Sequence, residues 1–375
     1  MQGPLAGIRV LELGGIGPGP FCGMMLADMG ADVIRIDRPG SPPHPVLQRS
    51  RRSLTINLKS PQGVAATRRL AGTCDAVLEG FRPGVAERLG LGPEDLMADN
   101  PALVYGRMTG WGQDGPLAQM PGHDINYIAI AGALHAIGGP DDPVPPLNLI
   151  GDFGGGGMLL AYGLACALLH AKTSGTGQVV DAAMVDGTAA LLAMTYGFLG
   201  TGNWRDERAV NRLDGGAPYY RVYRCADDKH IAVGCVEPQF FAAFLAILGL
   251  GDDPDFAAQN DEAAWPAMHR RLEQIFATKS RGEWAELFTG TDACTTPVLS
   301  LTEATQYPHN TARGTYRTAD GMVQPMPAPR FGSTPAGEPR PAPRPGQDTR
   351  KVLADAGLPD HDIEELINTG IATEA

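Results

Sequence analysis

Two short segments of the chain combine residue types that can move a proton. In Gly122–Tyr127, His123 stands beside a carboxylate, and in Gly151–Gly157, Asp152 stands shortly before a run of glycines. An imidazole and a carboxylate that face one pocket can serve as general acid and general base. They lie about thirty residues apart, so the fold must bring them together. The chemistry that this pair predicts is removal of a proton beside a carbonyl group.

Each of these residues also has a purely structural explanation. A histidine among turn residues, such as His123, is more often a structural hydrogen-bonding group than a catalyst. Asp152 is a favourable helix N-cap, although a helix N-terminus also offers N–H donors for an enolate oxygen. Glu237 precedes Pro238, which is typical of a helix start. As a partner of a histidine, Glu237 would orient the imidazole and raise its pKa.

Other chemistries lack their motifs. The chain has no G-x-S-x-G, no H-E-x-x-H and no P-loop, so serine hydrolysis, zinc proteolysis and nucleoside triphosphate hydrolysis have no support. The 6 cysteines are scattered, without a C-x-x-C pair. We therefore expect neither a metal site nor a disulfide framework.

The charge of the chain is unevenly distributed. A net charge of −12 over 375 residues argues against nucleic acid and acidic membrane surfaces as partners. Residues 35–69, however, hold many basic side chains and a single acid, Asp37. The basic residues are Arg35, Arg38, Arg49, Arg51, Arg52, Lys59, Arg68 and Arg69. This local reversal predicts a phosphorylated small ligand.

Targeting and membrane signals are not evident. The N-terminal residues do not read as a secretory signal, and the last residues carry no peroxisomal address. The apolar stretch 158–171 is shorter than the roughly 20 residues that span a bilayer, so it predicts a buried helix. We expect a cytoplasmic protein.

The first half of the chain alternates between strand and helix patterns. Strands are predicted at 8–12, 33–36, 54–58, 76–79 and 103–108, with helices between them, for example at 21–29 and 61–70. This order predicts an α/β domain with a doubly wound, Rossmann-like parallel sheet. Ligands of such sheets bind beyond the strand ends, where Arg38, Lys59 and Arg82 follow.

The glycine- and proline-rich loop at 14–20 is not a dinucleotide loop. It lacks G-x-G-x-x-G spacing, because Pro20 stands where the third glycine should be. Pro18 and Pro20 also lack N–H groups that a pyrophosphate would use. We interpret the loop as a tight turn from strand to helix.

Three regions are expected. A large α/β domain covers 1–200. Two predicted strands, at 217–225 and 230–235, and the helices after them indicate a smaller α+β domain at 215–310. Residues 320–375 begin with a Pro- and Gly-rich crossing segment and end in a helix that returns to the large domain.

The sequence resembles the family III CoA-transferases (the CaiB/BaiF superfamily), and within them the α-methylacyl-CoA racemases, over essentially its whole length. The segments that carry the resemblance are Gly7–Leu13, Asp28–Pro39, Arg107–Gln113, Gly122–Tyr127, Gly151–Gly156, Gly177–Asp186 and Gly346–Thr349.

The resemblance implies an interlocked homodimer whose active sites lie between the large domain of one subunit and the small domain of the other. His123 and Asp152 would be the acid/base groups, and Glu237 would support the histidine. No cofactor or metal is implied, since CoA is part of the acyl-CoA thioester substrate. The implied CoA contacts are Ile16, Arg38, Ile56, Asn57, Leu58, Lys59, Gly80, Phe81, Arg82, Arg88, Gly122, His123, Asp124, Ile125, Asn126 and Tyr127.

The implied activity interconverts (2R)- and (2S)-2-methylacyl-CoA by 1,1-proton transfer through an enolate. For this, burial must raise the pKa of Asp152 above the ordinary ~3.9 of an aspartate. In the alternative, CoA transfer, Asp152 would be a nucleophile that forms an acyl anhydride. His123 argues against that alternative, and a catalytically inactive acyl-CoA-binding protein is a third possibility. Met108, Met184 and Met194 are either a plastic surface for the acyl tail or ordinary core.

Overall fold

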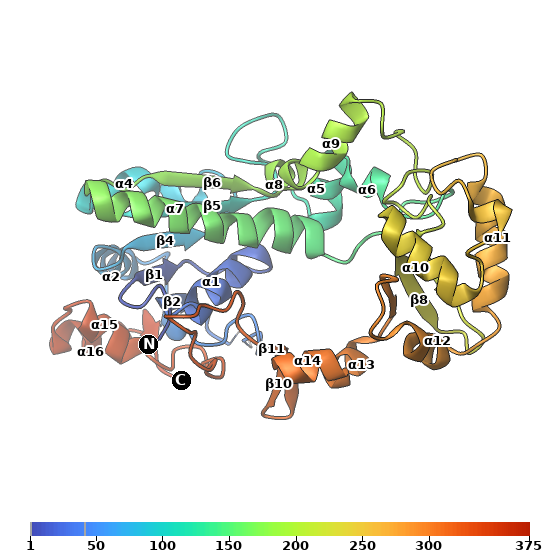
Figure 1. The fold of residues 1–375 in the computed structure, drawn as a ribbon. Helices are drawn as coiled ribbons and strands as arrows, with labels where there is room; N and C mark the ends of the chain where they lie inside the picture. The colour runs from blue at the N-terminus through green and yellow to red at the C-terminus, as the bar shows by residue number, and fades with distance from the viewer. Residues whose placement is uncertain (1, 41–42) are drawn as a thin grey trace. The chain divides into compact units, whose positions relative to one another are not determined.

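The computed structural model describes residues 2–40 and 43–375, which form two compact units (Figure 1). The first unit contains the chain up to Ala133, then Pro146–Ala193 and Tyr316–Ala375. The second contains Leu134–Pro145 and Met194–Thr315. The chain therefore leaves the first unit after His123 and returns to it before Asp152.

A 7-stranded sheet forms the centre of the first unit. Its order is β12-β3-β2-β1-β4-β5-β6, and only the edge strand β12 runs antiparallel to its neighbour. The strands are β1 (Arg9–Glu12), β2 (Asp32–Asp37), β3 (Arg52–Ile56), β4 (Ala76–Glu79), β5 (Val104–Thr109), β6 (Val179–Ala183) and β12 (Ala372–Thr373). The predicted doubly wound sheet is confirmed, and the strand order reverses between β1 and β4, where such sheets bind ligands.

Helices cover both faces of this sheet because strand residues alternate between them. Leu11 and Ile34 pack in one cluster with the helices α2, α4, α15 and α16, whereas Val10 and Val33 pack in a second with α1 and α7. In Figure 1 the long helix α7 lies along β5 and β6. The bounds are α1 (Pro18–Asp28), α2 (Pro61–Ala71), α3 (Val85–Arg88), α4 (Pro93–Asp99), α7 (Leu159–Ser174), α8 (Met184–Leu191), α9 (Ala193–Gly200), α15 (Thr349–Asp355) and α16 (Asp360–Asn368).

The region between β5 and α7 contains more helix than the sequence predicts. It forms α5 (Asp124–Ile130), α6 (Ala133–Ala136) and a π-helix, η1 (Leu149–Met158), that continues into α7. The helix predicted from 158 matches α7, but the π-helix in front of it was not predicted, because its glycines read as a loop. They serve close packing instead: a Cβ at Gly155 would lie 2.7 Å from the Thr188 nitrogen, and one at Gly157 would lie 2.6 Å from the Pro18 oxygen.

The continuous helix Leu149–Ser174 is 26 residues long, and by length and composition alone it could cross a membrane. A single such helix is weak evidence, because helices in protein cores pass the same test. In this fold Leu160 and Leu164 of α7 are fully buried in the cluster beneath the sheet. The inner face of the helix is therefore part of the core.

The second unit is an α+β structure with a 3-stranded antiparallel sheet, β7-β8-β9. Phe244, Phe276 and Phe288 stack in its core. The stretch after Ala264 forms two helices rather than one, since Ser280 begins the second with a capping box to Glu283. The elements are β7 (Tyr220–Arg224), β8 (His230–Gly234), β9 (Thr295–Pro297), α10 (Pro238–Leu248), α11 (Trp265–Phe276), α12 (Arg281–Phe288), α13 (Leu301–Gln306) and α14 (Pro308–Arg313).

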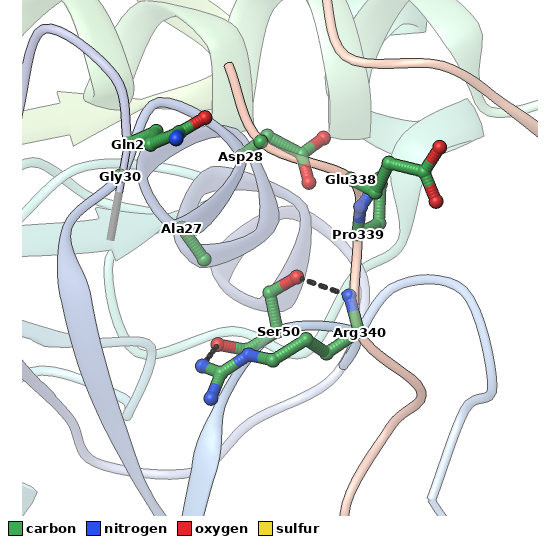
Figure 2. A pocket seen from close by; sticks show the side chains of 9 residues that line it. Gln2, Ala27, Asp28, Gly30, Ser50, Glu338, Pro339 and Arg340 are labelled. Atoms are coloured by element: carbon green, nitrogen blue, oxygen red, sulfur yellow. Dashed lines mark hydrogen bonds between the residues drawn. The ribbon is translucent and has the colours of Figure 1, made fainter.

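The chain re-enters the first unit through a hairpin, β10 (Tyr316–Ala319) and β11 (Met322–Pro325). Hydrogen bonds between Arg340 and Ser50 then tie it to the large unit. The Arg340 N–H donates to Ser50 Oγ (3.0 Å), and the Arg340 guanidinium donates to the Ser50 carbonyl (2.9 Å) (Figure 2). The Ser50 N–H donates in turn to the Arg340 carbonyl (3.0 Å). Asp28 and Glu338 line a pocket of about 300 Å³ beside this crossing.

Candidate active site

His123 is the N-cap residue of α5, with extended backbone (φ −134°, ψ 173°). Sequence analysis placed it in a loop, and the structure shows that the loop ends at this residue. Its backbone N–H donates to Oδ1 of Asn126 (3.0 Å), which fixes the first turn of the helix. The side chain is exposed, so a substrate can reach the imidazole.

Asp152 lies inside the first turns of η1, and the N-cap is Asn148. The prediction that Asp152 is itself an N-cap is therefore wrong, because the helix begins earlier than the glycines suggest. Asn148 donates through Nδ2 to Oδ2 of Asp152 (3.0 Å). The N–H of Asp152 donates to Oδ2 of Asp124 (2.7 Å). π-Helical turns are rare, and they are frequent at functional sites.

The environment of Asp152 favours a protonated carboxyl more than water does. Burial raises the pKa of Asp152, the negative charge of Asp124 raises it further, and the Asn148 hydrogen bond and His123 oppose this shift. Asp124, whose carboxylate accepts the N–H of Asp152, follows His123 directly in the chain, so the fold brings the two candidate groups close together. A carboxyl with a raised pKa can donate a proton as well as accept one.

The turn between β1 and α1 lies against the Asp152 carboxylate. Gly17 has φ +65° and ψ −115°, a conformation that glycine adopts far more readily than other residues. A Cβ at this position would be 3.2 Å from Oδ2 of Asp152. The neighbouring residue Ile16 leaves 83% of its surface exposed. The turn therefore brings an apolar side chain to the same place as the acid/base group.

Tyr127 forms one wall of the site, one turn after His123. Its ring meets Trp111 edge-on with the centroids 4.7 Å apart. A Cβ at Gly122 would lie 2.8 Å from the Tyr127 ring, so this glycine permits the close approach. Burial raises the pKa of Tyr127, and the charge of Asp152 adds to this. Sequence analysis gave Tyr127 only as a CoA contact, and the structure also places its hydroxyl in the electrostatic field of Asp152.

Most of the basic side chains in 35–69 do not form an open phosphate site, which corrects the interpretation of that stretch. Arg35 and Arg51 both pair with the buried Glu12, and Arg49 pairs with the buried Asp28. The others bind as follows: Arg52 pairs with Asp32 and Asp355, Arg68 with Asp99, and Arg69 with the carbonyls of Ala356 and Gly357. A buried arginine needs such partners. Most of the positive charge in this stretch therefore stabilises the fold and is not available to a ligand.

Three predicted CoA contacts, Leu58, Lys59 and Arg88, nevertheless share a pocket. Lys59 and Arg88 are exposed and line a hollow of about 580 Å³ together with Arg68, which the sequence analysis did not single out as a contact. Its apolar lining consists of Leu58, Pro61, Val64, Ala65 and Leu89. Cationic rims over an apolar floor suit a phosphorylated adenosine.

Arg38, Asn57 and the turn Gly80–Arg82 follow the strands β2, β3 and β4, and Ile56 is the last residue of β3. Arg38, Asn57 and Arg82 are exposed, whereas Ile56 is buried in the core with 4% of its surface exposed. The N–H of Phe81 donates to the buried carboxylate of Glu79 (2.6 Å), which holds the turn Gly80–Arg82 in place. Burial raises the pKa of Glu79 to about 7.

Glu237 belongs to the second unit, where it precedes α10 as its N-cap and is exposed. Its pairing with His123 stays a prediction. Among the methionines named from the sequence, Met108 and Met184 are buried in the core, and Met194 is exposed. The core interpretation therefore holds for the first two. Within residues 2–40 and 43–375, no group of three or more His, Cys, Asp or Glu side chains could hold a metal ion.

Comparison with known sequences identifies close relatives. Residues 5–349 match the profile of CoA-transferase family III. The chain is 45% identical over 365 residues to the alpha-methylacyl-CoA racemase of Mus musculus, with 96% of both chains covered, and 45% identical over 369 residues to that of Homo sapiens, again with 96% covered. It is 34% identical over 397 residues to succinyl-CoA–D-citramalate CoA-transferase of Chloroflexus aurantiacus, covering 97% of this chain and 96% of that one.

Solved structures share the fold. A CAIB/BAIF family protein from Brucella suis has a TM-score of 0.81 at 24% identity, covering 95% of this chain and 100% of that one. Rv3272 from M. tuberculosis has a TM-score of 0.78 at 28% identity, covering 93% and 98%. The profile match over nearly the whole chain confirms the resemblance seen in the sequence motifs, and the chain belongs to CoA-transferase family III.

Proposed function

We propose that this chain is a racemase that interconverts (2R)- and (2S)-2-methylacyl-CoA thioesters. One observation carries the proposal: the pKa of Asp152 is raised by burial, and the imidazole of His123 acts on the same carboxyl. Two acid/base groups that neighbour each other are what proton exchange between the two faces of one carbon requires. The relatives that share 45% identity with the chain are themselves named alpha-methylacyl-CoA racemases.

In the proposed reaction one group begins deprotonated and removes the proton at C2. The C–H electron pair moves into the thioester and produces an enolate, and the other group then donates its proton to the opposite face of C2. Each turnover leaves the two groups with exchanged protonation, and the reverse direction begins from that arrangement. No oxidant, metal or cofactor is consumed.

Hydrogen-bond donors must stabilise the enolate oxygen while it exists. The N–H of Asp152 itself donates to Asp124. We therefore propose that neighbouring N–H groups in the first turns of η1 donate hydrogen bonds to the enolate oxygen. A helix N-terminus carries partial positive charge, which favours this.

The alternative, CoA transfer through an aspartyl anhydride, uses Asp152 as a nucleophile. A nucleophilic aspartate attacks as the carboxylate, so burial that favours the protonated form works against that step. The transferase reaction also gives no task to the exposed imidazole of His123. The chain is also 34% identical to a CoA-transferase, so an experiment must exclude CoA transfer.

We propose that CoA binds across the strand ends, with its phosphorylated adenosine in the pocket lined by Lys59, Arg68 and Arg88. We further propose a homodimer in which Glu237 reaches the partner's site. The outer face of α7 supports a second copy, since Tyr162 and Leu169 leave 70% and 68% of their surfaces exposed. Large exposed apolar side chains that gather on one face of a helix are typical of interfaces.

The test is exchange of the C2 proton in D2O. A single epimer of a 2-methylacyl-CoA is supplied without any acceptor acid, so that a transferase has nothing to transfer to. Deuterium at C2 together with formation of the other epimer supports the racemase.

A further inference from the structure

The carboxylate of Asp124 is buried, with 6% of its residue surface exposed, at the start of α5. Its Oδ2 accepts the N–H of Asp152 at 2.7 Å. The same oxygen lies so close to Gly151 that a Cβ there would be 2.6 Å away. Asp124 is therefore in contact with the backbone on both sides of the peptide that leads into Asp152.

The other oxygen of this carboxylate is unusual. Oδ1 of Asp124 is buried and has no hydrogen-bond partner among the described residues. A buried carboxylate oxygen without a donor is costly, and such groups occur where function maintains them. An asparagine could also accept the Asp152 N–H through its side-chain oxygen without burying a charge, so the negative charge of Asp124 itself calls for an explanation.

We propose that Asp124 is a positioning residue that fixes the backbone of Asp152 and keeps a second negative charge beside its carboxyl, so that Asp152 can hold a proton. This inference rests on the proposed racemase function and extends it, since it gives Asp124 a role separate from CoA contact. Two carboxylates close together cannot both ionise freely. Asp124 has a donor on Oδ2 but none on Oδ1 among the described residues, so its buried charge disfavours ionisation of its neighbour.

The surroundings of Asp152 contain few other charges. Among the described residues, Asp124 and His123 are the charged groups that shift the pKa of Asp152, and Asn148 adds a hydrogen bond. The helices α8 and α1 also pack against η1. Their carboxylates, Asp186 and Asp28, do not act on Asp152, and Asp28 is paired with Arg49. Burial, and then the charge of Asp152, raise the pKa of Tyr127 in α5, which favours a neutral phenol there.

The inference makes a specific claim about pH dependence. Racemisation needs one proton shared between His123 and Asp152, so activity is lost at low pH when both are protonated. In Asp124→Asn the pKa of Asp152 falls, because a negative neighbour has gone. The acidic limb of kcat/KM then moves to lower pH. The form of the enzyme with its proton on Asp152 also becomes rarer, so the maximum of kcat/KM in the pH profile falls. An enzyme cannot alter the equilibrium between the epimers, so both directions must lose the same factor.

The experiment compares kcat/KM against pH for both epimers in the unaltered protein, Asp124→Asn and Asp124→Ser, where Ser keeps a small acceptor if Asn fails to fold. The matched control is Asp181→Asn. Asp181 also has a raised pKa and accepts one backbone N–H, from Gln113 at 3.3 Å, but it does not act on Asp152.

An acidic limb that moves to lower pH in the Asp124 variants, and stays in place in Asp181→Asn, supports the inference. A lower plateau with an unmoved limb means that Asp124 is merely structural and overturns it. If the unaltered protein exchanges no C2 proton at all, the proposed function fails and this inference fails with it.

Discussion

The side-chain amide of Asn148 donates to Oδ2 of Asp152 at 3.0 Å, from the N-cap of the same helix. This bond opposes the effect of burial, because a donor to the carboxylate stabilises its ionised form and lowers the pKa. In Asn148→Ala the pKa of Asp152 therefore rises, and the acidic limb of kcat/KM moves to higher pH. The measurement is the pH profile of epimerisation. Asn100→Ala removes a comparable amide bond, to the Cys74 carbonyl, and leaves the limb unmoved.

The turn at Gly17 is expected to link stability and activity. In Gly17→Ala the new Cβ meets Oδ2 of Asp152 and the backbone adopts a strained conformation. We expect a loss of about 1–3 kcal/mol in the free energy of unfolding, together with a fall in kcat. Gly175→Ala is the control, since Gly175 also has positive φ (+75°) but open space around it. The measurements are the free energy of unfolding in urea and kcat for both variants. A Gly17→Ala variant that stays fully active would contradict the contact with Asp152.

The pocket lined by Lys59 and Arg88 predicts a KM effect that is separate from chemistry. Each of Lys59→Ala and Arg88→Ala removes a charge-assisted contact to a phosphate. We therefore expect KM to rise about tenfold in each variant, with kcat little changed. The KM of a dephospho-CoA thioester, which lacks the 3′-phosphate, measures the contribution of that phosphate directly. Lys172→Ala, which removes a surface lysine paired with Asp75, serves as the control. Equal KM values for all three variants would show that CoA binds elsewhere.

Co-expression of two inactive variants tests whether Glu237 acts across subunits. If it does, a mixed dimer of His123→Ala and Glu237→Ala subunits contains one site with both lesions and one intact site. Activity then returns, although each variant alone is inactive. If Glu237 serves the His123 of its own chain, every site carries a lesion and the mixed dimer stays inactive. Differently tagged subunits, purified over both tags, provide the mixed dimer for the assay.

The alternating pattern of strand and helix predicted the fold of the first unit well. Buried strands such as 76–79 have apolar residues bounded by turns, and the structure has β4 at those residues. The start of the long helix was not predictable in the same way. Glycines at 154–157 have poor helix propensity, and they are helical here because α1 and α8 pack directly against their backbone. Such contacts between distant segments are not visible in a local pattern.

The site shows the same division. Residue type and sequence context single out His123 and Asp152 as candidates, but they do not reveal the surroundings of these residues. The eight basic residues of 35–69 suggested phosphate binding, yet Arg35 and Arg51 pair with Glu12, which is far away in the sequence. The buried Asp124, beside the exposed His123, gave no separate signal, because adjacent residues in a sequence do not reveal which one points inward.

The most direct test of the central claim is C2 proton exchange with one epimer of a 2-methylacyl-CoA in D2O, without acceptor acid, followed by mass and epimer composition. The account predicts deuterium at C2 in step with epimerisation, and a loss of about 10²–10⁴-fold in His123→Ala and in Asp152→Ala. The contrary result would be no exchange under these conditions, with CoA moving to a free acid once one is added. That outcome would make Asp152 a nucleophile and the chain a CoA-transferase.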